Sequence, residues 1–356
     1  MHLEEGTLSP VYKEYQAQKA LWLCAGAVLL AITAMLSISL GAVRIPPMEV
    51  LATVLGKGET SKWQLIIWNV RLPQTLTALV AGAGLSVAGV VMQSILRNPL
   101  GSPFTLGISN AAAFGAALSV MVFGAGQMQS SQVGAVTLFN PLAATGAAFL
   151  TSLVATGIIV LLSRMRGATP ESMVLTGVAL ASLFTAATML LQYFADDAQL
   201  AAMVFWTFGD VGRAGWRELQ IMSVFIGVML IYFFAHRWDY NAIDAGEEAA
   251  LGLGVQVQRI RLVGMLCASL ISSVVVAFVG VIGFVGLVCP HMVRLIIGDD
   301  HRFLIPGTAI FGALLLLGAD TAARLALAPR VLPVSVLTSF LGAPLFIWLV
   351  LRRGRL

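Results

Sequence analysis

Long apolar runs recur along the chain and are separated by short polar stretches. A helix needs about 20 apolar residues to cross a bilayer, and most of these runs have that length. The pattern therefore predicts an all-α integral membrane protein. Ten spans are predicted, near residues 20–42, 72–95, 104–124, 138–163, 172–194, 217–236, 259–281, 285–297, 303–327 and 335–352.

The span predicted at 285–297 is shorter than the others. Gly286 and Pro290 interrupt it, which favours a broken or re-entrant helix. A similar Gly- and Pro-rich stretch, RNPLGSPFTLG, follows the second span. Paired interrupted segments are typical of transporters built from inverted repeats, although this pairing alone does not decide the fold.

Positive charge predicts the orientation of the spans, because cytoplasmic loops are enriched in Lys and Arg. With both termini inside, 13 of the 21 Lys and Arg residues lie on the cytoplasmic side. We therefore divide the chain into a cytoplasmic N-terminal segment, 1–19, and one transmembrane domain, 20–356, with a cytoplasmic loop at 237–258.

Composition agrees with a membrane protein. The chain has 356 residues, of which 58% are hydrophobic and 11% charged, and its mean hydropathy is +0.91. An ordinary soluble domain has roughly 45–50% apolar and 25% charged residues. No room is left for a sizeable soluble domain, so we expect the function to lie in the membrane or at its faces.

Motifs of membrane hydrolases are absent from the sequence. There is no HExxH, no GxSxG with a suitable acid and histidine downstream, and TFGD at 207–210 lacks the first glycine of GxGD. The four histidines and three cysteines are scattered, so neither a metal site nor a disulfide framework is predicted. We do not expect the chain to be an enzyme.

Ion-coupled transport and ATP-driven transport require different sequence features. An ion-coupled carrier needs ionisable groups inside the membrane, and the one candidate is Asp320, which Arg324 four residues later can pair with. An ATP-driven pump needs GxxxxGK[ST], and GKGETSK at 56–62 has the wrong spacing. If transport uses ATP, ATP and Mg are therefore expected to bind to a partner chain. An ion-coupled secondary transporter is the alternative function, and a channel is the third.

The polar stretch DAGEEAALGLG at 244–254 lies in the predicted cytoplasmic loop. Glu248, Ala249, Ala250 and Gly254 spell EAAxxxG, in which helix formers precede glycines. Such a segment favours a short surface helix with a sharp exit. It predicts either a rigid docking element for an ATPase or an ordinary solvated loop.

Small residues recur at helical spacing in the spans. In the second span Ala78, Gly82 and Ser86 are each four residues apart and share one face. Helices in lipid associate closely through such faces, so we expect a tight helix–helix contact there.

Four runs identify the family that the chain resembles. They are RLPQTLTALVAGAGLSVAGVVMQSILRNPLGSPFTLGISNAAAFGA at 71–116, GFVGLVCPHMVRLIIGDDHRFLIPG at 283–307, and LLGADTAAR with LPVSVLTSFLGAPLFIWLVLRR toward the C-terminus. These resemble FecCD-type permease subunits of ABC importers for ferric siderophores, haem and cobalamin. The resemblance covers nearly everything from about residue 70 onward.

The resemblance implies the type II ABC importer permease fold, with ten transmembrane helices, in a prokaryotic inner membrane with both termini cytoplasmic. It also implies a second permease subunit, expected to be an identical copy in a homodimer, two cytoplasmic ATPase subunits and an extracytoplasmic binding protein. The fifth and tenth helices would line the pathway. An iron chelate is the first expectation for the cargo, and siderophore, haem and cobalamin stay open.

The resemblance also assigns roles to single residues. Glu248, Ala249, Ala250 and Gly254 would contact the ATPase, and Arg71 and Arg324, oriented by Asp320, would dock the binding protein. Gln74 stands where the family often has a second Arg. The proposed gate and pathway residues are Thr169, Thr176, Ser182, Thr185 and Gln192, with Met173 and Met189 on the same span.

Overall fold

The computed structural model describes residues 10–58, 60–123, 141–328 and 331–353, and every regular element in these ranges is helical. In chain order the elements are α1 Pro10–Ser39, α2 Pro47–Val54, α3 Ser61–Ile66, η1 Ile67–Arg71, α4 Leu72–Ile95, α5 Ile108–Phe123, α6 Pro141–Met165, α7 Pro170–Phe194, α8 Asp197–Thr207, η2 Val211–Arg213, α9 Trp216–Ala235, α10 Arg237–Ala245, α11 Glu247–Gly252, α12 Val257–Val279, α13 Val285–Ile297, α14 His301–Ala326 and α15 Val334–Arg353.

Each of the ten predicted spans corresponds to one helix. The predicted bounds of α4 and α13 agree with the structure. Within the described ranges seven helices are long and apolar enough to cross a membrane, and α5, α13 and α15 contribute shorter apolar helices. The short helices α2, α3, α8 and α10 were not predicted, whereas α11 is the surface helix expected in the EAAxxxG segment.

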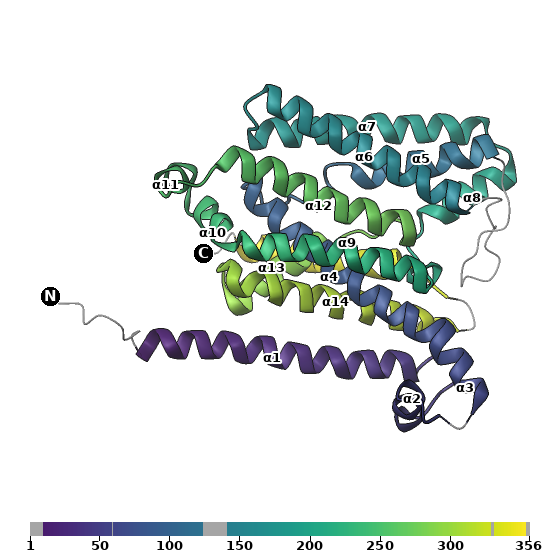
Figure 1. Cartoon of the computed structure of the whole chain (residues 1–356). Coiled ribbons are helices and arrows are strands. Elements are labelled where there is room, and N and C mark those ends of the chain that lie inside the picture. Colours follow the sequence, from purple (N-terminus) through teal and green to yellow (C-terminus); the bar gives the residue numbers. More distant parts are fainter. Residues whose placement is uncertain (1–9, 59, 124–140, 329–330, 354–356) are drawn as a thin grey trace.

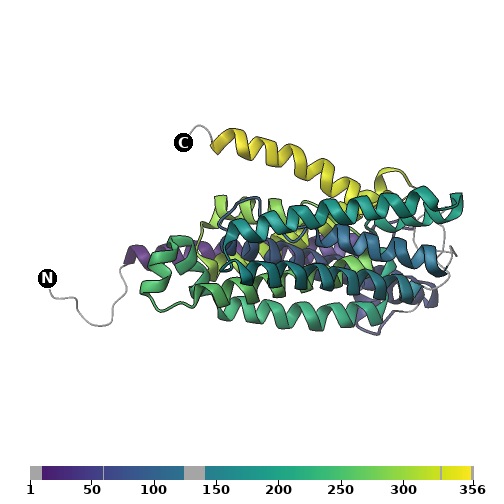
Figure 2. The same cartoon turned by 90° about the horizontal axis from the view of Figure 1, so that it is seen from above.

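The long helices lie alongside one another in an elongated bundle (Figure 1). α10 and α11 lie at the same end of the bundle as the start of α1 and the end of α15, whereas α2, α3 and α8 lie at the opposite end. We call these the inner end and the outer end. Seen from above, α15 diverges from the bundle toward its C-terminal end (Figure 2).

α4 is the central helix of the bundle and packs against α9, α12, α13 and α14. The small-residue face predicted for it is present: Ala78, Gly82 and Ser86 are buried, and the Ser86 hydroxyl donates to the Thr308 carbonyl of α14 at 2.9 Å. At Gly82 an added Cβ would lie 2.4 Å from the Gly312 carbonyl oxygen. The two backbones therefore touch directly, as expected for helices that associate in lipid.

A second close crossing joins α4 to α13. A Cβ on Gly89 would lie 1.8 Å from the Gly286 carbonyl oxygen. α13 is continuous through Gly286 and Pro290, so the interruption expected at these residues is wrong. Gly286 instead lets the short helix pack closely on α4.

α5 begins four residues later than predicted, because the stretch before it forms turns. Pro99 and Pro103 each lack a backbone donor. Ser102 and Thr105 bond to each other's backbone nitrogens at 3.0 and 3.1 Å, and these local bonds compete with a helix. α5 and α13 thus each follow an irregular stretch, as the paired interruptions in the sequence indicated.

We expect Gly89→Ala to destabilise the permease, because the new methyl group overlaps the α13 backbone and overpacking costs about 1–3 kcal/mol. The measurement is the thermal midpoint of the purified protein in detergent. Gly227→Ala in α9 is the control, since nothing lies within 4 Å of its added Cβ. A midpoint for Gly89→Ala equal to that of the control would contradict the crossing.

Candidate functional site

A hollow with a volume of about 870 Å³ lies between the helices. Five segments line it: the stretch from Phe104 into α5, the outer half of α7, Thr207 and Phe208 at the end of α8, the residues after α12 around Gly283, and the first half of α15. The two irregular stretches meet here, since an added Cβ on Gly283 would lie 3.6 Å from the Phe104 ring. Interrupted helices therefore shape the cavity wall.

The cavity wall combines apolar side chains with neutral polar ones. Asn110 of α5 donates to the Thr185 hydroxyl of α7 at 2.7 Å, which joins two of the lining helices. None of the lining residues in the described part of the chain is Asp, Glu, Lys, Arg or His. Such a wall can hold a large solute by shape and hydrogen bonds without an ion pair.

The sequence placed only part of this lining. Thr185, Met189 and Gln192 line the cavity, whereas Thr176 and Ser182 do not, and Met173 is fully buried. Asn110 and the α15 residues of the lining were not predicted from the sequence. A stripe of Ser335, Ser339 and Ala343, each four residues apart in an apolar span, was the signal that could have indicated the α15 face.

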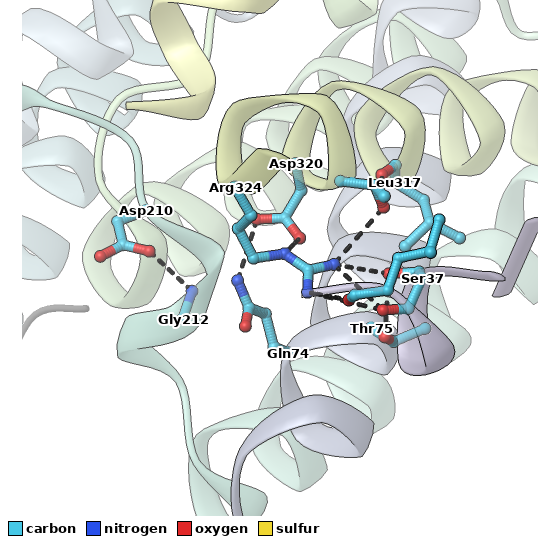
Figure 3. A network of polar contacts seen from close by, with 10 residues as sticks. Ser37, Gln74, Thr75, Asp210, Gly212, Leu317, Asp320 and Arg324 are labelled. Atoms are coloured by element: carbon cyan, nitrogen blue, oxygen red, sulfur yellow. Dashed lines mark hydrogen bonds and ion pairs between the residues drawn. The ribbon is translucent and has the colours of Figure 1, made fainter. Parts of the chain in front are cut away.

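A polar network holds α1, α4 and α14 together at the outer end (Figure 3). The ion pair predicted between Asp320 and Arg324 is present, with 3.0 Å between Oδ2 and Nε. Gln74 donates to the other carboxylate oxygen at 3.0 Å, and Arg324 donates to the Ser37 hydroxyl at 2.7 Å. Gln74 therefore supports the ion pair from α4.

Arg71 lies close to this network and is directed inward. Its side chain donates to the carbonyls of Ile38 and Ser39, the second at 3.0 Å, and also to the carbonyl of Val43. Only 6% of the residue is exposed. The docking role of Arg71 and Arg324 stays a prediction, but in this chain a partner carboxylate would have to displace these internal contacts.

The EAAxxxG segment is the exposed inner tip of the molecule. Glu248, Ala249 and Gly254 are exposed. Ala250, however, is 0% exposed and points into the chain, which corrects the expectation that it belongs to an outward contact. Exposed apolar contact surface comes instead from Leu251 and Leu253, 59% and 74% exposed, which the motif did not single out.

α10, which leads into this tip, is tied to α14. Asn241 donates to Asp300 at 3.1 Å and accepts from the His301 backbone nitrogen at 2.9 Å. Burial raises the pKa of Asp300, but hydrogen bonds from Arg302 and Asn241 outweigh it and lower the pKa to about 2. The carboxylate is therefore ionised throughout the physiological pH range and remains an acceptor for Asn241 of α10.

Thr169 caps the start of α7. Its hydroxyl accepts from the Ser172 backbone nitrogen at 3.3 Å, and Pro170 is the first helical residue. A capping hydroxyl followed by proline is a common start of a helix. A gating role for Thr169 stays a prediction.

In the described ranges no three His, Cys, Asp or Glu side chains form a group that could hold a metal ion.

The helical bundle, its interrupted helices and the neutral cavity define a multi-pass membrane transport protein. The chain belongs to the FecCD transport family, whose model matches residues 29–352. It is the permease subunit of an ATP-binding-cassette importer.

Relatives from archaea and bacteria cover almost the whole chain. A protein of Methanocaldococcus jannaschii named as an ABC transporter permease is 53% identical, covering 96% of this chain and 97% of the relative. The hemin transport system permease of Yersinia pestis is 38% identical over 92% of this chain and 94% of its own length. The vitamin B12 import permease of Escherichia coli is 36% identical over 96% and 98%.

A solved structure shares the architecture. It is described as an inward-facing conformation of a metal-chelate type ABC transporter and superposes with a TM-score of 0.78 at 31% identity. The match covers 93% of this chain and 98% of that one. The all-helical permease fold expected from the sequence is confirmed.

We expect Arg71→Met to lower the stability of the permease with no partner present, because three carbonyls lose their donor at about 1–3 kcal/mol each. The measurement is the thermal midpoint of the purified chain. Arg44→Met is the matched control, since Arg44 is exposed in the same outer region. An unchanged midpoint together with weaker binding-protein affinity would instead assign Arg71 to docking.

Proposed function

We propose that the permease imports an intact metal chelate. The first candidate is an iron chelate, either a ferric siderophore or haem, and the next candidate is cobalamin. The relatives named for hemin and vitamin B12 and the neighbour named for metal chelates support this class of cargo. In each of these solutes a large organic ligand already holds the metal. The permease therefore needs no metal ligand of its own.

The neutral cavity is the observation that carries the proposal. Its volume of about 870 Å³ lies in the range of about 300–1,000 Å³ typical of small-molecule sites. Because the wall has no charged side chains, a bulky solute can pass without being bound tightly by ion pairs. α7 and α15 supply most of this wall, in agreement with the pathway helices that the resemblance implied.

The same observation weighs against an ion-coupled carrier. Such a carrier needs an ionisable group on the transport path. Asp320, the one acidic residue predicted inside a span, is paired with Arg324 and hydrogen-bonded to Gln74 away from the cavity lining. Its charge therefore serves the packing of the outer end.

The proposed assembly pairs two copies of this chain through the face that carries α7 and α15. Both helices expose large apolar side chains, among them Leu175, Tyr193 and Phe340, and both line the cavity. A second copy would close the cavity wall and complete a central pathway. The inner end would face the cytoplasm, because it carries the EAAxxxG segment and the excess of basic residues.

Two cytoplasmic ATPase subunits are proposed to supply the energy, and ATP and Mg would bind to them. α11 suits this contact because Glu248, Ala249, Leu251 and Leu253 form an exposed, partly apolar tip on a short helix. Gly254 gives the sharp exit at a φ of 81°. An extracytoplasmic binding protein is proposed to deliver the chelate at the outer end.

Reconstituted uptake tests the proposed function. Vesicles containing the permease, its ATPase and its binding protein are loaded with ATP inside, and ferric siderophore, haem and cobalamin are offered in turn. We expect uptake of one of them that requires ATP hydrolysis and persists when ionophores collapse the ion gradients. Uptake that follows an ion gradient and ignores ATP would establish the secondary carrier instead.

Two adjacent alanines of α11 test the ATPase contact. We expect Ala249→Arg to leave the thermal midpoint of the free permease unchanged but to abolish co-purification with the ATPase, because Ala249 is exposed. Ala250→Arg should lower the midpoint as well, since a charged side chain cannot fit at a fully buried position. Full ATPase binding by Ala249→Arg would remove α11 from the contact.

A bulky side chain in the cavity tests the pathway. We expect Thr185→Trp to reduce chelate uptake at least about tenfold while ATP hydrolysis continues, because the indole fills the space beside Asn110. Val224→Trp on the exposed face of α9 is the control. Equal uptake by the two variants would place the pathway elsewhere.

A further inference from the structure

Arg261 of α12 is the largest fully buried side chain in the described structure, with 1% of the residue exposed. A buried guanidinium must be paired and hydrogen-bonded, since its removal from water is costly. Its three partners come from three different segments. They are the Ile95 carbonyl at the end of α4, at 2.9 Å, the Ala168 carbonyl between α6 and α7, at 2.9 Å, and the Glu247 carboxylate that begins α11, at 3.2 Å.

The turn held by Arg261 has an unusual backbone. Gly167 and Ala168 have φ values of 76° and 55°, and alanine rarely adopts a positive φ. The Ala168 backbone nitrogen donates to the Ser163 carbonyl at 2.7 Å. Such conformations persist only where the surroundings hold them, and the bond from Arg261 to the Ala168 carbonyl is one of the contacts that do so.

This turn leads directly into a helix of the cavity wall. Thr169, next to Ala168, is the N-cap of α7, and α7 lines the cavity farther along with Thr185 and Gln192. A displacement of the Ala168 carbonyl therefore acts directly on Thr169, the residue that caps α7.

The third partner belongs to a short helix with a glycine at each end. Gly246, immediately before Glu247, has a φ of 130°, and Gly254 has a φ of 81°. Glycines tolerate large backbone changes at both ends of α11. The Glu247 side chain is 43% exposed, so a partner that displaces α11 also displaces or releases this carboxylate.

We infer that Arg261 is a positioning residue that transmits displacement of α11 to the turn before α7, and so links ATPase movement to the pathway. The inference rests on the proposed ATPase contact at α11. A guanidinium suits the task because its planar fork holds several acceptors in fixed relative positions, whereas a lysine ammonium offers a point charge. When Glu247 moves, the fork reorients or loses its ion pair, and the Ala168 carbonyl is no longer held in place.

A label on α7 reads out the inferred movement. In the complete complex with Cys24→Ser, a spin label at Glu171→Cys in both permease copies reports the distance between the two helix starts. Glu171 is exposed and lies in the first turn of α7. We expect the distance to change when a non-hydrolysable ATP analogue binds to the ATPase subunits.

Glu247→Ala is the decisive variant, because it removes the link to α11 and leaves both carbonyl bonds of Arg261 in place. We expect this variant to bind the ATPase and hydrolyse ATP normally but to lose at least half of the distance change. Uptake should fall about tenfold, the factor expected for one charge-assisted hydrogen bond. Glu247→Gln, which keeps an acceptor oxygen, should restore part of both.

Two further variants separate transmission from simple packing. Arg259→Gln is the matched control, since Arg259 is an exposed arginine on the same helix, and it should behave as the wild type. Arg261→Gln should lose the distance change. Adding Glu247→Ala to this variant should cause no further loss, because both substitutions remove the same contact between Arg261 and Glu247. Additive losses, or a full distance change in Glu247→Ala, would overturn the inference.

The wild-type complex distinguishes failure of the inference from failure of the proposed function. If the wild type shows no nucleotide-dependent distance change and no ATP-driven uptake, the proposed ATPase coupling is wrong. If the wild type shows both and Glu247→Ala is indistinguishable from it, only the role of Arg261 is wrong.

Discussion

The structure depends on the direct backbone contact between α4 and its two neighbours. Gly82 meets Gly312 of α14, and Gly89 meets Gly286 of α13, with no room for a Cβ at either crossing. Lipid tails are as apolar as the helices, so close packing must supply the attraction that water supplies in a soluble core. These crossings give the bundle a rigid centre.

Buried charged groups complete this centre at its two ends. At the outer end Asp320, Arg324 and Gln74 join α1, α4 and α14, and at the inner end Arg261 joins α4, α11 and the turn before α7. Asp320 and Arg261 are nearly excluded from solvent, and each has partners on more than one element. Because an unpartnered buried charge is very unfavourable, each network also restricts how its helices can shift.

The remaining helices are far less enclosed by their own chain. α1 and α7 are mostly exposed, in contrast to α4 and α12, and α15 diverges from the bundle (Figure 2). A transporter needs such a division, because the pathway must change shape while the framework stays folded. The cavity lies where α7 and α15 meet the rigid part, and the turn before α7 lies where Arg261 can act on it.

The sequence by itself determined the number, order and approximate limits of the spans, including the shortness of α13, because the length of an apolar run is a local property. It did not determine that α13 stays continuous through Gly286 and Pro290. It also determined the family, the Asp320–Arg324 pair and the small-residue face of α4. Only the tertiary structure decided that Ala250 and Arg71 point inward, that Thr185 and Gln192 but not Thr176 line a cavity, and that Arg261 joins three segments. The direction of a side chain depends on how each helix is rotated against its neighbours, and that rotation is set by packing between residues far apart in the sequence.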